Sequence, residues 1–82
     1  MMPAGTLSRV QKVWPEVVGA SIAAEARPTA ERGGTLTVSC SSAVWAAELE
    51  MMGRQIVSAL NGALGGEARI EALRCLTSGT GE

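Results

Sequence analysis

The chain has 82 residues, which is enough for one small domain with a single hydrophobic core. Seven basic and eight acidic residues give a formal net charge of -1, so the chain as a whole is not drawn electrostatically to nucleic acid or to an anionic membrane. Because histidine is absent and only two cysteines are present, the four ligands of a usual zinc site cannot be gathered, and we expect no metal and no cofactor. No apolar run approaches the ~18 residues of a membrane span, and the N-terminus lacks the parts of a signal peptide, so we expect a cytoplasmic protein.

The first predicted elements are two helical segments behind a flexible lead-in of residues 1–5. From Thr6, which can cap a helix, apolar residues recur at the three-and-four spacing of one helix face. Pro15 interrupts this pattern, because proline lacks an amide donor and its ring clashes with the preceding turn. We therefore expect a break at Trp14-Pro15, with Pro15 opening a second segment that ends near Ala24.

Two strands and a tight turn are predicted next. Residues 27–31 should be extended, since the residue before Pro28 avoids the α region, and Arg32-Gly33-Gly34 is typical of a hairpin turn. Residues 35–40 alternate strictly between apolar and polar side chains, which is the pattern of a half-buried strand. The apolar face carries Leu36, Val38 and Cys40 and the polar face Thr35, Thr37 and Ser39. We expect the polar face to be open to solvent or to a partner, and both Cys40 and Cys75 to be buried thiols.

A long helix is predicted between residues 41 and 61, with Ser41 or Ser42 as its N-cap. Its apolar residues form one stripe, so the helix should face the core along its whole length. Gly53 lies inside it and either marks a close approach of another backbone or is simply tolerated. The glycines that follow favour a helix stop. Residues 62–65 also match the bare G-x-x-G of KH nucleic-acid-binding domains, but they include no basic residue, and we favour the helix stop.

Residues 68–76 form the last predicted strand, and residues 77–82 a flexible tail. The element order is helix, strand, strand, helix, strand within a single domain of residues 6–76. A helix between the second and last strands places those two strands parallel, whereas the hairpin pair is antiparallel. The expected fold class is α+β, with the helices packed on one face of a three-stranded mixed sheet. The expected core comprises Leu7, Val10, Trp14, Val17, Val18, Ile22, Leu36, Val38, Trp45, Leu49, Met52, Ile56 and Leu60.

The sequence offers no residue set for catalysis, and we expect a protein that is not an enzyme. It has no histidine, aspartate or tyrosine, and its serines lack a base to activate them. No G-x-x-x-x-G-K-[ST] phosphate-binding motif is present, and we expect no small-molecule substrate. The basic residues are scattered, but Arg27 and Arg32 would form a small basic patch for nucleic acid if the hairpin lies beside Arg69 and Arg74.

Three stretches of the sequence carry a family resemblance, and they read TLSRVQKVWPEVVGASIAAEARP, GTLTVSCSSAVWAAELEMM and IVSALNGALGG. The most specific parts are Trp14 followed by Val17-Val18-Gly19, and Leu36-x-Val38 leading into Ser42-x-x-Trp45 with Leu49 one helical turn on. Over residues 7–76 the chain resembles the DciA-type family of small bacterial proteins. The resemblance implies a KH-like fold without a working G-x-x-G loop. It also implies a role as loader or operator of the DnaB-type replicative helicase, without ATP hydrolysis of its own.

We therefore expect a non-enzymatic adaptor in bacterial DNA replication that binds the ring-shaped DnaB-type helicase and assists its loading on single-stranded DNA, with weak direct DNA contact. Trp14 and Trp45 lie on apolar stripes, which favours packing in the core over anchoring a partner. The expected partner surface is the exposed side of the long helix with its start and a turn residue: Arg32, Ser41, Ser42, Glu48 and Arg54. Two alternatives remain, namely a stand-alone KH-like module for RNA or single-stranded DNA and a structural dimerisation domain.

Overall fold

The computed structural model describes residues 5–66 and 69–77. Within them, the elements in chain order are α1 (Thr6–Val18), α2 (Ala20–Glu25), β1 (Ala26–Arg32), β2 (Thr35–Cys40), α3 (Ala43–Met51), α4 (Gly53–Leu64) and β3 (Ala72–Thr77). Residues 1–4 of the expected lead-in and residues 78–82 of the expected tail lie outside the described residues. The same holds for Ala68, the expected start of the last strand.

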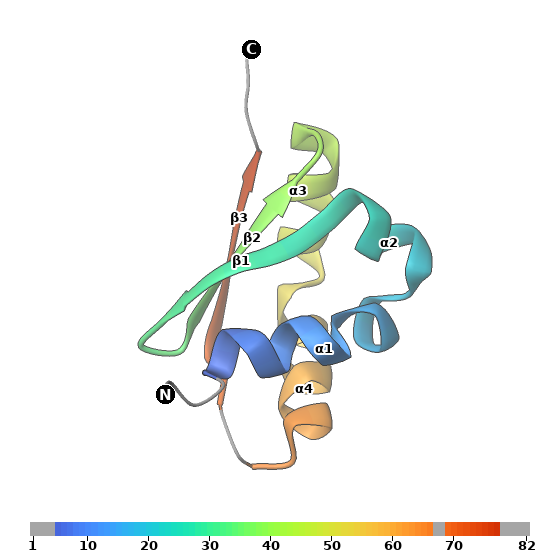
Figure 1. Ribbon diagram of the computed structural model, residues 1–82. Coiled ribbons are helices and arrows are strands. Elements are labelled where there is room, and N and C mark those ends of the chain that lie inside the picture. Colours follow the sequence, from blue (N-terminus) through green and yellow to red (C-terminus); the bar gives the residue numbers. More distant parts are fainter. Residues whose placement is uncertain (1–4, 67–68, 78–82) are drawn as a thin grey trace.

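The strands form one mixed sheet in the order β1-β2-β3. β1 and β2 are antiparallel and are joined by Gly33 and Gly34, whose φ values of 57° and 91° lie in the left-handed region that glycine reaches without steric cost. β2 and β3 are parallel, with α3 and α4 between them in the chain. Figure 1 shows the helices gathered on one side of this sheet, which confirms the predicted α+β class.

The core lies between the sheet and the helices. Alternation in β2 turns Leu36, Val38 and Cys40 inward, and all three are buried. Trp14 of α1 is buried as well, and its indole Nε1 donates a hydrogen bond to the Ala26 carbonyl oxygen at 2.9 Å, which satisfies the polar end of the ring. Every residue of the expected core either is buried or packs against the buried cluster. That cluster also contains apolar residues outside the expected set, namely Ala26, Leu64 and Ile70.

Pro15 does not break the first helix, contrary to the sequence prediction. α1 continues through it to Val18, and the chain leaves the helix at Gly19, where φ is 94°. Proline removes the bond that its own amide would have donated to the Gln11 carbonyl and crowds the preceding turn, but α1 is held by its packing, with apolar residues on both sides of Pro15 in or against the core. The Gly19 amide still donates to the Pro15 carbonyl at 2.9 Å. The break therefore falls at the residue with a left-handed backbone and not at the proline.

The predicted long helix is in fact two helices. Met52 has φ -94° and ψ 9°, and this ψ lies outside the helical range, so α3 ends at Met51 and α4 begins at Gly53. The start of α3 agrees with the sequence, because Ser42 is the N-cap and its Oγ accepts a hydrogen bond from the Trp45 amide at 3.4 Å.

The end of α4 is set by a glycine, as the sequence indicated, but later than Asn61. The helix continues to Leu64, and Gly65 then takes the left-handed conformation with φ 65° and ψ 26°. Residues 62–65 are thus a helix end, which agrees with the helix stop favoured over a G-x-x-G loop.

β3 begins at Ala72, later than the expected residue 68, because the chain before it is held by Asn61 of α4. The Asn61 Nδ2 donates to the Ile70 carbonyl at 2.8 Å, and the Asn61 Oδ1 accepts from the Ile70 amide at 2.7 Å. These bonds replace strand pairing, so Ile70 is buried without belonging to the sheet. Within β3, Leu73 and Cys75 pack in or against the core.

Candidate functional site

The side of the sheet that faces away from the helices forms the candidate site, and we call it the outer face. Residues paired across neighbouring strands point to the same side of a sheet, so the register assigns them to faces. Ser39, for example, pairs with Arg27 on β1 and with Leu76 on β3. The three rows of the outer face are Arg27, Ser39 and Leu76, then Ala30, Thr37 and Arg74, then Arg32, Thr35 and Ala72.

Three arginines lie on the outer face, and none of its paired positions in the described strands carries a carboxylate. Arg27, Arg32 and Arg74 are all exposed. Glu31 of β1 pairs instead with the inward-facing Leu36, and its Oε2 accepts a hydrogen bond from the Gly34 amide at 2.9 Å. Positive charge is therefore concentrated on one face of a chain whose net charge is -1. Such a face attracts anions even where the whole chain does not.

A hollow of about 470 Å³ lies on this face between Arg32 and Arg74. Small side chains leave the space, since Ala30, Thr35 and Thr37 line it together with the two arginines and Glu31. A guanidinium group can bind a phosphate or carboxylate with two parallel hydrogen bonds, and a threonine hydroxyl can donate another. The two arginines and the threonine hydroxyls can therefore bind an oxyanion beside the Glu31 carboxylate, whose Oε2 already accepts a hydrogen bond from the Gly34 amide.

The structure brings together three of the four arginines that we expected to contact nucleic acid. Arg27 and Arg32 come from β1, and Arg74 faces the same side from β3. Arg69 is exposed but precedes β3 and does not belong to the sheet. The hairpin thus lies beside the last strand, which is the condition that we set for a basic patch. β2 is the strand of the hairpin that pairs with β3, and it lies between β1 and β3.

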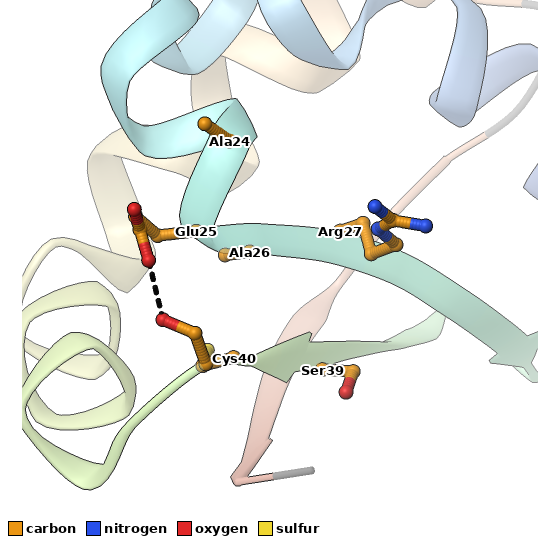
Figure 2. A pocket seen from close by; sticks show the side chains of 7 residues that line it. Ala24, Glu25, Ala26, Arg27, Ser39 and Cys40 are labelled. Carbon is orange, nitrogen blue, oxygen red and sulfur yellow. Dashed lines mark hydrogen bonds between the residues drawn. The ribbon is translucent and has the colours of Figure 1, made fainter.

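At the end of the sheet far from the hairpin, Glu25, Arg27 and Ser39 lie around a hollow (Figure 2). Ser41 is bound twice to Glu25 there, since its amide donates to the Glu25 carbonyl at 2.8 Å and its Oγ donates to the Glu25 Oε1 at 2.6 Å. These bonds join the end of α2 to the start of α3 beside a hollow of about 340 Å³, which Arg27 and Ser39 also line. Ser41 and Ser42, both expected to bind a partner, therefore have structural roles as a link between elements and as an N-cap.

The other expected partner-binding residues are spread over the molecule. Arg32 lies at the hairpin end of β2 and Ser41 follows the opposite end, about 17 Å away for a strand of this length. Arg32 and the start of α3 therefore lie at opposite ends of β2. Glu48 is exposed on α3 and Arg54 on α4, two helices separated by the break at Met52.

Sequence reasoning also missed apolar side chains that α3 exposes. Val44 and Met51 are 71% and 84% exposed. A signal was available, because only two of the nine residues in AVWAAELEM are charged or polar, which leaves this helix without a polar face for solvent.

The two cysteines occupy neighbouring strands on the inner face and form no disulfide. The two thiols lie close enough to influence each other's pKa. Burial raises the pKa of the Cys40 thiol above its usual 9.0. Burial, with help from Cys40 and Glu50, raises the pKa of the Cys75 thiol to about 11. Since the thiolate is the nucleophile and the metal ligand, these protonated thiols act as apolar core groups.

The described part of the chain provides little else that could carry chemistry. No group of three or more His, Cys, Asp or Glu residues within it could hold a metal ion. Among the same residues, no helix has the length and apolar character needed to cross a membrane.

The sequence of this chain matches the model of a known protein family. The family model described as "Dna[CI] antecedent, DciA" matches residues 1–75. The chain belongs to the DciA family. This confirms the resemblance that the segments around Trp14, Trp45 and Leu60 carry, and it covers all the elements of the DciA chain up to the middle of β3.

Several relatives of this DciA chain bear the name UPF0232 protein. One from Rhodococcus jostii (strain RHA1) is 44% identical over 61 residues, which are 74% of this chain and 32% of the relative. One from Mycobacterium ulcerans is 42% identical over 52 residues, or 63% of this chain and 28% of the relative. One from Mycobacterium tuberculosis (strain H37Rv) is 41% identical over 54 residues, or 66% and 29%. The matched segment is thus less than a third of each of these relatives.

Proposed function

We propose that this DciA chain is a non-enzymatic adaptor in bacterial DNA replication. It binds the ring-shaped DnaB-type replicative helicase and assists its loading on single-stranded DNA. Membership of the DciA family supports the role in replication. The composition supports the absence of catalysis, because the chain has no histidine, aspartate or tyrosine and hence few groups for acid-base work.

The observation that carries the DNA part of the proposal is the outer face. Arg27, Arg32 and Arg74 place three cations along one side of the sheet, with the hydroxyls of β2 between them. Arginine and hydroxyl groups are the usual donors to phosphate oxygens, and such contacts position a protein on nucleic acid without reading its sequence. The outer face has no aromatic side chain on which a base could stack, so the proposed contact is with the backbone and is weak.

The helicase contact belongs on the other side of the molecule. Glu48 on α3 and Arg54 on α4 are exposed on helices that cover the inner face of the sheet, away from the outer-face arginines. A protein partner bound there leaves the outer face open to DNA. The adaptor can then hold the helicase and the strand at the same time.

Two titrations test the proposal, one against the purified replicative helicase and one against a fluorescent single-stranded oligonucleotide. Each is run at about 50 mM and about 200 mM salt, the range over which phosphate contacts weaken measurably. We expect saturable helicase binding at both salt concentrations and weak oligonucleotide binding that declines as salt rises.

Two other results would contradict the adaptor. Tight, salt-sensitive oligonucleotide binding without a helicase complex would favour the stand-alone nucleic-acid-binding module. Failure to bind either, together with an oligomeric state that depends on protein concentration, would favour the dimerisation domain.

A further inference from the structure

α3 presents an apolar surface that the rest of the described chain does not cover. The large apolar side chains that are exposed among the described residues are Val44, Met51 and Leu76, and two of the three lie on this one helix. Ala47, between Val44 and Met51 in sequence, is exposed as well. A surface helix normally turns a polar face to water, so an uncovered apolar stripe of this kind marks an interaction surface.

The exposed apolar residues fall on a single line along the helix. With about 100° per residue, Val44, Ala47 and Met51 lie within one stripe, because they are three and four positions apart. The buried Leu49 and the half-buried Trp45 occupy the opposite side, where α3 packs on the sheet. We call Val44, Ala47 and Met51 the α3 stripe.

The α3 stripe has an acidic residue on each side. Glu48 lies about 40° from Val44 in one sense, and Glu50 lies about 60° from Ala47 in the other, given about 100° per residue. Both are exposed. The described part of α3 contains no basic residue that would neutralise them. The surface is therefore an apolar line between two negative edges.

We infer that the α3 stripe is the docking surface for an amphipathic helix of a partner protein whose apolar face is bordered by lysine or arginine. The apolar face would cover Val44, Ala47 and Met51, and the basic borders would meet Glu48 and Glu50. Helix-in-groove and helix-on-helix recognition uses anchors at this spacing, and opposite charges beside the anchors fix the orientation.

The charges of Glu48 and Glu50 indicate which kind of partner can bind the α3 stripe. A second copy of the chain packed symmetrically on the same stripe would bring Glu48 and Glu50 against their own counterparts, which is a repulsive arrangement. Nucleic acid and anionic membranes are repelled by the same two carboxylates. A basic amphipathic helix can cover the apolar stripe with its apolar face and pair its basic residues with Glu48 and Glu50.

The test is an NMR titration of the ¹⁵N-labelled chain with two designed helical peptides of about 18 residues, long enough to hold a helix. Both peptides carry leucine at three-and-four spacing, one with lysine borders and the other with glutamate borders. We expect the lysine peptide to shift the amide signals of α3 and the glutamate peptide to leave them unchanged. A lysine peptide that shifts no α3 signal, or shifts only signals of the outer face, overturns the inference.

Two variants distinguish specific binding at the α3 stripe from nonspecific hydrophobic association. Glu48→Lys combined with Glu50→Lys should reverse the preference, so that the glutamate peptide binds and the lysine peptide does not. Met51→Ser removes the most exposed apolar side chain of the stripe and should weaken lysine-peptide binding at least ~10-fold without unfolding the chain.

Sedimentation of the free chain at rising concentration tests whether a second copy of the chain binds the α3 stripe. We expect a monomer throughout. Self-association that Met51→Ser abolishes would assign the stripe to a second copy and overturn the inference.

Discussion

Among single residues, Asn61 links α4 to the chain that leads into β3. Its side-chain amide makes two hydrogen bonds to the backbone of Ile70 and so fixes the segment that leads into β3. Asn61→Ala removes both bonds and leaves the Ile70 amide and carbonyl without those partners, which should cost about 2–3 kcal/mol in the free energy of unfolding. Urea denaturation measures this as a lower midpoint with an unchanged slope.

Ser58→Ala is the matched control for Asn61→Ala, because Ser58 is exposed on the same helix. It should change the unfolding free energy by less than about 0.5 kcal/mol. Equal stability of the two variants would show that the Asn61 bonds do not hold the chain before β3.

The Cys75 thiol makes the stability of the fold depend on pH in the alkaline range. Burial and its neighbours raise the pKa of this thiol from 9.0 to about 11 in the folded chain. The folded state thus holds the proton more tightly than the unfolded state does, and this contribution to stability is present below pH 9. It is lost as the pH rises from 9.0 toward about 11.

Thermal melting of the chain and of Cys75→Val between pH 8 and about pH 10.5 checks this dependence. We expect the melting temperature of the wild-type chain to fall more steeply above pH 9.0 than that of the variant. Parallel pH profiles would mean that the thiol titrates normally in the fold.

At the element scale, Gly53 opens α4 without any need for glycine. A methyl group added there would meet no atom within 4 Å beyond its chain neighbours and its own helix backbone. Its φ is not in the left-handed range, so Gly53 is tolerated and no other backbone packs against it. Gly53→Ala should therefore raise stability by about 0.5–1 kcal/mol, because alanine loses less backbone entropy on folding. In a chain of this size the melting temperature should rise by about 2–8 °C.

Gly34→Ala is the contrasting variant. Gly34 has φ 91°, and a Cβ there would lie 3.2 Å from the Glu71 Cγ, so alanine should destabilise the hairpin by about 1–3 kcal/mol. A stabilising Gly34→Ala, or a destabilising Gly53→Ala, would contradict the backbone conformations described for these two positions.

The sequence predicted strands better than it predicted helix boundaries, for a physical reason. The alternation of residues 35–40 depends on a single element half-buried against a core, and the structure has β2 over those residues. The spacing of apolar residues in a helix, by contrast, can continue through a break between two helices when the apolar faces of both pack on the same core. Leu49 of α3 and Ile56 of α4 are both buried, so the spacing carried no trace of the break at Met52.

The candidate site was harder to predict from the sequence than the fold was. Arg27, Arg32 and Arg74 are up to 47 positions apart in sequence, and only the sheet order and register place them on one face. Arg27 and Arg74 each lie next to buried residues in the sequence, which predicts that they point outward but not that they share one face. The extra residue at the irregularity between Pro28 and Ala30, which keeps Arg32 on the same side as Arg27, has no signal that we can identify in the sequence.

At the scale of the whole molecule, two surfaces of opposite character lie on opposite sides of the sheet. The outer face carries three arginines, and the α3 stripe carries two glutamates beside apolar residues. A chain with net charge -1 can in this way be selective for an anion on one side and for a cationic protein surface on the other. This separation is the property expected of an adaptor between a strand of DNA and a protein.

Salt dependence measures the proposed phosphate contacts of the outer face. Three phosphate contacts to single-stranded DNA should give a slope of about -2 for the logarithm of the binding constant against the logarithm of salt concentration. Arg27→Ala, Arg32→Ala and Arg74→Ala should each make this slope shallower by about 0.7. Fluorescence anisotropy of a labelled oligonucleotide provides the measurement.

Lys12→Ala is the control for charge alone, because Lys12 is exposed on α1, on the helical side of the sheet. It removes one positive charge and should leave the salt slope unchanged. An equal effect of Lys12→Ala and Arg74→Ala would mean that net charge, and not the outer face, governs DNA binding.

We propose that the chain helps a ring helicase onto single-stranded DNA through its outer face. The most direct measurement is the rate at which purified replicative helicase displaces a labelled strand from a closed single-stranded circle, with and without the chain. We predict that the wild-type chain raises this rate, and that a variant with Arg27, Arg32 and Arg74 all replaced by alanine binds the helicase but raises the rate less. An unchanged rate with the wild-type chain would contradict the adaptor, and equal stimulation by the triple variant would contradict the role of the outer face.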